Sequence, residues 1–315
     1  MSEYPIDLPD VAQKLCNLPV VRPVAARIKH ELDAHAGFGA LIQLLSLEPA
    51  IAAEILVAAN APAYGFASRI HTVPEAVRIL GWDHAKRLVR AVVNVPQPVD
   101  GLRDSVIQAS WIHGLASAFF ATEMALFFGV PEDRAYVIGL THDIGRLGLL
   151  SSFPEQYLEV MAHRYDTLPE FLAAEERAVG MNHAKAGLWL ARTWGLPADF
   201  SEAAGEHHDQ CADENGPASA LVRLACRLAH ASGFPAEPCD QVSPTDSESE
   251  PGPNTPLHQV LNQVQTSGLA KLWEHIDPFY PALSRSQKRQ EDGDPTNFPP
   301  VRHVRAALPF CRWPY

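Results

Sequence analysis

The run AYVIGLTHDIG, residues 135–145, is the most informative stretch for the fold class, because it reads as one apolar helical segment interrupted by a polar pair. This pair, His142 and Asp143, lies between the apolar residues Leu140 and Ile144, so both polar side chains are expected to be buried. On one helix they would point about 100° apart. A divalent cation could compensate the cost of burying them. Taken alone, however, the pair favours a structural, hydrogen-bonded role over a metal site.

The sequence on both sides of this run also predicts helices. Residues 104–128 are apolar around most of a helical circumference, which is typical of a central buried helix. The segments from Thr72 to Glu75 and from Thr167 to Glu170 are capping boxes with a Pro in the first turn. No run of alternating β-branched residues is long enough to predict a strand with conviction. The chain is therefore expected to be all-α.

Four further histidines lie where predicted helices could bring them to the same place. His113 is on the apolar stripe of helix 104–128, His183 follows a predicted N-cap at Asn182, and His207 and His208 close another helix. Facing helices of a bundle build metal sites in this way. The candidate ligands are His113, His142, Asp143, His183, His207 and His208. Imidazoles with one carboxylate suit Fe, Mn, Ni or Zn better than Ca or Mg.

Each of these histidines also has an alternative interpretation without a metal. His113 could be a hydrogen-bonded core residue, and His183 could be a solvent-exposed residue at a helix start. His207 and His208 could instead stabilise the carboxyl end of their helix through the helix dipole.

Composition excludes several classes of protein. The 315 residues are 47% hydrophobic and carry a formal net charge of −12, with a pI near 5.6, so nucleic acid is an unlikely partner. Lys86, Arg87 and Arg90 form a small basic patch that fits an ordinary solvated helix face. No uninterrupted apolar run approaches the ~20 residues needed to cross a bilayer, and the five scattered cysteines form no C-x-x-C pair. A cytoplasmic protein without membrane contact is expected.

Changes in composition divide the chain into five predicted parts. Two helical halves cover residues 11–100 and 101–236. Residues 237–256 are rich in Pro, Ser and acidic residues and predict a flexible linker. Residues 257–280 predict an amphipathic helix, and residues 281–315 a disordered tail.

Several motifs in order along the chain resemble the HDOD domain, a member of the HD superfamily. They are LEPAIAAEILVAANAPAYG at 47–65, IHTVPEAVRILG at 70–81, SWIHGLASA at 110–118, GLTHDIGRLGLL at 139–150 and ERAVGMNHAKAGLWLARTWGLP at 176–197, followed by His207-His208. The resemblance covers roughly residues 11–235 and implies an HD-superfamily helical bundle of the HDOD type. It also implies that the six candidate residues match metal-ligand positions of the related HD-GYP phosphodiesterases.

Two of the family's ligand positions are changed in this chain. Ala109 stands where those enzymes have a carboxylate one turn before the first His, and Cys226 stands where they have a closing Asp. Lys185-Ala186-Gly187 replaces the GYP segment. These departures weaken the resemblance to the catalytic relatives, while five histidines and one Asp remain to bind an ion.

The expected function is therefore a regulatory signal-transduction module that acts through protein–protein interaction and can hold a structural transition-metal ion. Its expected partners are signalling proteins, including a second copy of itself as a homo-oligomer. The extension formed by residues 237–315 would dock a partner or fold back as a lid. The alternative is a metal-dependent phosphohydrolase acting on a nucleotide or cyclic dinucleotide, with Asp143 as the catalytic residue.

Overall fold

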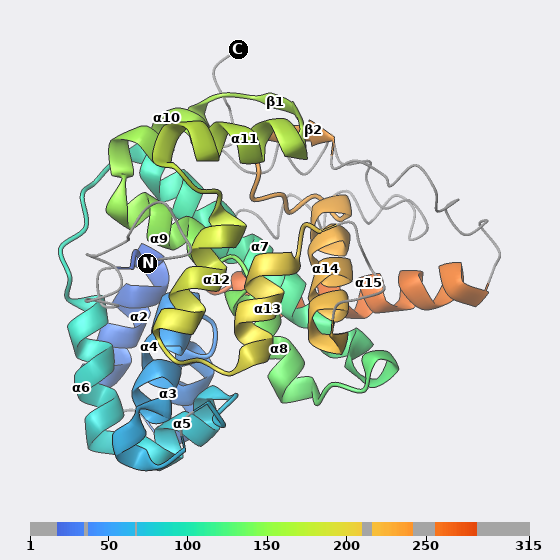
Figure 1. The fold of residues 1–315 in the computed structure, drawn as a ribbon. Helices are drawn as coiled ribbons and strands as arrows, with labels where there is room; N and C mark the ends of the chain where they lie inside the picture. Colours follow the sequence, from blue (N-terminus) through green and yellow to red (C-terminus); the bar gives the residue numbers. More distant parts are fainter. Residues whose placement is uncertain (1–17, 35–36, 67, 210–215, 242–255, 282–315) are drawn as a thin grey trace.

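A computed structural model describes residues 18–34, 37–66, 68–209, 216–241 and 256–281 (Figure 1). The predicted tail, from residue 282, and most of the predicted linker, from 242 to 255, lie outside these residues. The described chain is predominantly α-helical, which confirms the expected fold class.

The amino-terminal helices form one group, drawn in blue to teal in Figure 1. They are α2 (Arg22–Asp33), α3 (Phe38–Leu45), α4 (Pro49–Asn60), the short 3-10 helix η2 (Pro62–Tyr64), α5 (Val73–Leu80) and α6 (Trp82–Val93). The side chain of Thr72 accepts a hydrogen bond from the Glu75 backbone N–H, as its capping box predicts. Buried Asn60 holds the following loop through bonds to the backbone of Arg69 and Ile70.

The second group of helices is arranged around α7 (Gly101–Phe128), which packs against α8 (Glu132–Thr141) and α14 (Pro217–Ala231). The helices α9 (Ile144–Ser152), α10 (Pro154–Ala162), α11 (Leu168–Val179), α12 (His183–Thr193) and α13 (Ala198–Glu206) complete it. By length and composition α7 could cross a membrane. Most of its residues are instead buried against neighbouring helices, as in the core helix of a globular domain.

Two short strands occur among the described residues, and neither was predicted from the sequence. β1 (Tyr165–Thr167) and β2 (Cys239–Gln241) pair in parallel, with Tyr165 opposite Cys239. This pairing ties the segment after α14 to the segment before α11. The strands have three residues each, so the fold remains all-α.

The last helix, α15 (Pro256–Ile276), packs along α7. Gly268 lies against the ring of Phe120, where a Cβ atom would come within 2.5 Å of Cδ1. The Trp273 ring contacts Phe234, and Lys271 pairs with Glu123. In the described residues α15 is therefore docked on the helical domain.

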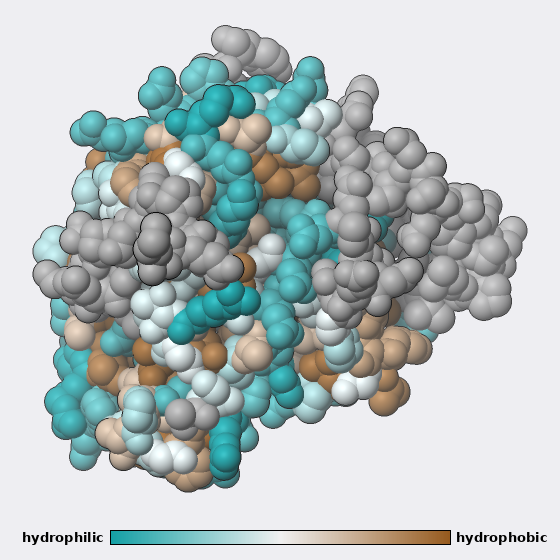
Figure 2. All heavy atoms as spheres, viewed as in Figure 1, coloured by the Kyte–Doolittle hydropathy of each residue, from teal (hydrophilic) through white to brown (hydrophobic). Residues whose placement is uncertain are grey.

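Hydrophilic residues are interspersed with separate hydrophobic areas on the face shown in Figure 2. Among the described residues, the exposed large hydrophobic side chains come from four separate stretches of sequence, namely Phe38, Phe66, Val99 and the pair Leu126 and Phe127. Such scattered exposure is ordinary in folded proteins, so these side chains by themselves identify no interface.

Candidate metal centre

His142 and Asp143 lie at a break between two helices, and not inside one helix as the sequence suggested. α8 ends at Thr141, and α9 begins at Ile144. The backbone of Asp143 has φ −95° and ψ 17°, which leaves the α-helical region and turns the chain. The expectation of a 100° separation on one helix was therefore wrong. The turn directs both side chains towards the same interior space.

Two glycines allow the helices around this break to approach their neighbours closely. A Cβ atom on Gly139 would lie 2.8 Å from the Cα of Ala118 in α7. A Cβ atom on Gly145 would lie 2.0 Å from the carbonyl oxygen of His183 in α12. Both contacts are with backbone atoms, which cannot move aside as a side chain can. The absence of a side chain at these positions therefore brings α7, α8, α9 and α12 together at the site.

Four imidazoles are oriented by hydrogen bonds from Nδ1. His113 donates to the carbonyl oxygen of Phe234, His142 to that of Gly139 and His207 to that of Ala204. His183 donates to a carboxylate oxygen of Glu175. The four distances are 2.7–2.9 Å. Because these oxygens can only accept, each Nδ1 carries the proton and each Nε2 is left with its lone pair. Histidines that bind metals are usually oriented in this way, with one ring nitrogen donating to an oxygen and the other free to bind the ion.

The six residues singled out from the sequence meet in one interior cluster. Asp143 Oδ1 lies 3.4 Å from His207 Nε2 and 3.5 Å from His183 Nε2, and Asp143 Oδ2 lies 3.9 Å from His113 Nε2. The Nε2 atoms of His183 and His208 are 2.9 Å apart. The His142 ring lies against the rings of His113 and His207. The alternative in which His183 is exposed to solvent is wrong, because its side chain is fully buried.

The interpretation of His207 as a helix-end residue is also correct in part. Its Nδ1 donates to the Ala204 carbonyl in the last turn of α13, while its Nε2 faces Asp143. One ring therefore serves both the helix end and the cluster.

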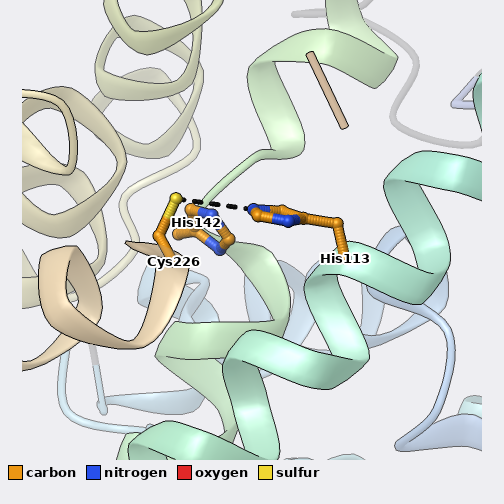
Figure 3. A group of neighbouring side chains, drawn as sticks. All are labelled: His113, His142 and Cys226. Atoms are coloured by element: carbon orange, nitrogen blue, oxygen red, sulfur yellow. Dashed lines mark hydrogen bonds between the residues drawn. The ribbon is translucent and has the colours of Figure 1, made fainter. Parts of the chain in front are cut away.

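Cys226, at the position of the missing closing Asp, lies beside His113 and His142 (Figure 3). Its Sγ is 3.5 Å from His113 Nε2. Burial, together with nearby Glu237 and Asp143, raises the pKa of the thiol well above its usual value. Without an ion, Cys226 is therefore a neutral thiol that can donate to His113. His113, His142 and Cys226 also form a group with the spacing of metal ligands.

Three charged residues of the site were missed by sequence reasoning. Arg146 is fully buried: its Nε donates to Asp143 Oδ2 at 2.8 Å, and its Nη2 donates to Glu237 Oε1 at 2.6 Å. Buried Glu175 accepts from His183 and from Tyr157. Arg146 could have been found as a charged residue in the apolar run after Asp143. Glu237 gave no signal, because it lies in a segment that was predicted to be a linker.

Burial and the buried arginine set the charges of the cluster. Burial lowers the pKa of His142 to about 3, and burial together with the neighbouring imidazoles lowers the pKa of His208. For Asp143 and Glu237, burial would raise the pKa, but Arg146 and the neighbouring histidines together outweigh it and hold both pKa values well below the usual range. Neutral imidazoles and ionised carboxylates are the forms that bind metal ions.

Three ligand atoms of the cluster are left without another partner. His142 Nε2, Asp143 Oδ1 and His207 Nε2 are buried, lie within 4.8 Å of one another, and have no hydrogen-bond partner elsewhere in the described chain. Buried polar atoms of native proteins are usually satisfied, and three such atoms facing one another form a group able to hold a metal ion. Two imidazoles and one carboxylate fit a divalent transition metal.

Comparison with known proteins identifies the family of the chain. The family model of the HDOD domain matches residues 18–210. An uncharacterised protein of Treponema pallidum (strain Nichols) is 27% identical over 176 residues, which cover 54% of this chain and 33% of that protein. The chain thus spans about a third of the length of this curated relative.

Solved structures resemble this fold over most of the chain. The MmoQ response regulator from Methylococcus capsulatus str. Bath has a TM-score of 0.62 at 23% identity, covering 81% of this chain and 97% of that chain. A virulence factor from Campylobacter jejuni subsp. jejuni has a TM-score of 0.50 at 14% identity, covering 95% and 98%. At these identities the likeness shows the fold alone.

Proposed function

The chain belongs to the HDOD domain family, and we propose that it is a cytoplasmic regulatory module of signal transduction whose helical core is stabilised by one divalent transition-metal ion. Its ligands would be His142, Asp143 and His207. The main support for a metal site is that three buried ligand atoms face one another and have no other hydrogen-bond partner. The structural likeness to a response regulator supports a place in signalling.

Burial of the cluster favours a structural ion over a catalytic one. Asp143 is 6% exposed, His142 and His207 are 1% exposed, and the His208 side chain is 10% exposed. A nucleotide could not reach these atoms without movement of the surrounding helices. An ion held in such a place would fix the helices that supply its ligands, and this is a stabilising role.

Metal analysis tests this proposal. We expect protein purified without chelator to retain close to one equivalent of Fe, Mn, Ni or Zn, measured by mass spectrometry of the elements. His142→Ala and His207→Ala should lose it, and His163→Ala, at an exposed histidine outside the cluster, should keep it. Absence of metal after reloading with each ion would refute the metal part of the proposal.

The regulatory part predicts contacts with other proteins, including a second copy of this chain. Light scattering coupled to gel filtration measures self-association, and cross-linking in cells followed by mass spectrometry identifies signalling partners. A strictly monomeric chain that cross-links to no signalling protein would contradict this part.

A metal-dependent phosphohydrolase is the second candidate, favoured by a carboxylate, Asp143, within the ligand set. When bound, the metal would lower the pKa of a coordinated water. The chain's own contribution would be Asp143 holding one proton of that water. Turnover of a nucleotide or cyclic dinucleotide, lost in Asp143→Asn, would establish this activity, and inactivity of the metal-loaded protein across such a panel would exclude it.

A further inference from the structure

Arg146 lies in the centre of a second set of metal-ligand atoms. Its Nη2 is 2.6 Å from Glu237 Oε1 and 3.1 Å from His183 Nε2, and its Nε is 2.8 Å from Asp143 Oδ2. His208 Nε2 completes the set, at 2.9 Å from His183 Nε2 and 3.6 Å from Glu237 Oε1. Two carboxylate oxygens and one imidazole nitrogen therefore accept from one guanidinium group, and His208 Nε2 lies beside two of these three atoms. Such donors also suit a divalent transition metal.

The guanidinium has no route to solvent, because the Arg146 side chain is 0% exposed. Its Cζ lies over the Phe171 ring, 5.3 Å from the ring centroid. A buried arginine is stable only when carboxylates compensate its charge, and here Asp143 and Glu237 both do so.

The charge balance of the cluster matches one divalent ion and not two. Three carboxylates, Asp143, Glu175 and Glu237, and one guanidinium leave a formal charge of −2 when the imidazoles are neutral. One divalent ion at His142, Asp143 and His207 would bring the buried cluster to neutrality. A second divalent ion would leave an uncompensated charge of +2 in the interior, which is costly.

We propose that the Arg146 guanidinium is a built-in cation that occupies the place of a second metal ion and limits the chain to one. The proposal deepens the proposed function, since it concerns the same cluster. It predicts that a neutral side chain at position 146 opens a second divalent-ion site made by Asp143, His183, His208 and Glu237.

The segment between α14 and β2 supplies one wall of this second site. Glu237 follows the region matched by the HDOD family model, which ends at residue 210. The same segment provides the Phe234 carbonyl that orients His113, and it is anchored by the pairing of β2 with β1. Glu237 is thus a carboxylate outside the matched region, eleven residues after Cys226, that partners the built-in cation.

The test compares ion stoichiometry in the full-length wild type and Arg146→Met, which has similar length and no charge. Both proteins are loaded with Mn²⁺ or Zn²⁺, desalted and weighed by native mass spectrometry. We expect Arg146→Met to bind one ion more than the wild type. Arg146→Lys, which keeps a positive charge, and the double variant Arg146→Met/Glu237→Gln should both return to the wild-type number.

Arg223→Met is the matched control, because Arg223 is also a buried arginine but lies on α14 without an ion pair to the cluster's carboxylates among the interactions described. Its ion number should equal that of the wild type. Since Arg146→Met leaves two carboxylates without their cation, its thermal melting is followed with and without Mn²⁺. We expect the ion to raise its melting temperature more than that of the wild type.

The outcomes separate this inference from the proposed function. No ion in the wild type and one in Arg146→Met would support the built-in cation and refute the resident metal. One ion in the wild type and one in Arg146→Met would support the resident metal and refute the built-in cation. Equal stoichiometry, or failure of Arg146→Met to fold even with Mn²⁺ or Zn²⁺ present, would overturn the inference.

Discussion

Replacing Gly145 by Ala should destabilise the protein strongly, although Ala is the better helix former. Gly145 is in α9, where Ala would ordinarily gain up to about 1 kcal/mol over Gly. Its Cβ, however, would lie 2.0 Å from the His183 carbonyl oxygen and 2.5 Å from the Gly187 backbone nitrogen. Ordinary contact begins at 3.4 Å, so α9 and α12 would have to separate by about 1.4 Å.

The cost follows from what has to move. Overpacking a core typically costs about 1–3 kcal/mol, and more where the neighbour cannot adjust. Here the neighbour is the backbone at the start of α12, which also carries the imidazole of His183. We expect the free energy of unfolding to fall by about 3 kcal/mol or more, and metal binding to weaken because His183 is displaced.

Urea denaturation followed by circular dichroism measures the effect, with two other helical glycines as controls. A Cβ on Gly148 would meet only the flexible Leu190 side chain, at 2.6 Å, and a Cβ on Gly39 would meet nothing within 4 Å. We expect Gly148→Ala to be intermediate and Gly39→Ala to be neutral or stabilising. If Gly145→Ala proved as stable as Gly39→Ala, the close approach of α9 and α12 described here would be wrong.

Three further predictions concern other parts of the fold. Burial raises the pKa of Glu48 from 4.5 to about 7, so the folded chain binds a proton that the unfolded chain releases. The free energy of unfolding should therefore fall as the pH rises, by up to about 3 kcal/mol between pH 4.5 and 8. Urea titrations of the Glu48→Gln variant should not show this fall. Tyr157→Phe removes the hydroxyl that donates to buried Glu175 and should lower the free energy of unfolding by about 1–3 kcal/mol, measured in the same way. Gly268→Val should push α15 away from Phe120, and unchanged hydrogen-exchange protection of α15 would contradict its docking.

Much of the local structure could be predicted from the sequence. The capping box at Thr167 has the predicted hydrogen bond from the Glu170 backbone, and the Asn182 side chain accepts from Lys185 at the start of α12. The long apolar helix around His113 is the central buried helix that its composition indicated. These features depend on neighbours within a few residues, so they are visible in the order of residues alone.

The break between α8 and α9 was not predictable in the same way. Every residue from Ala135 to Leu150 is compatible with one continuous helix, so local propensity does not place an end at Thr141. The end is imposed by packing, because Gly139 fits against α7 and Gly145 against α12, which fixes two helix directions at once.

The sequence by itself determined the helical class, the family and the set of six residues that meet in the cluster, because periodicity, caps and ordered motifs are written along the chain. Only the tertiary structure decided how the cluster is charged. Arg146 and Glu237 are 91 residues apart and form their ion pair in the interior. The free energy of such a pair depends on burial and on the distance between its atoms, and both are set when helices from different parts of the chain pack together.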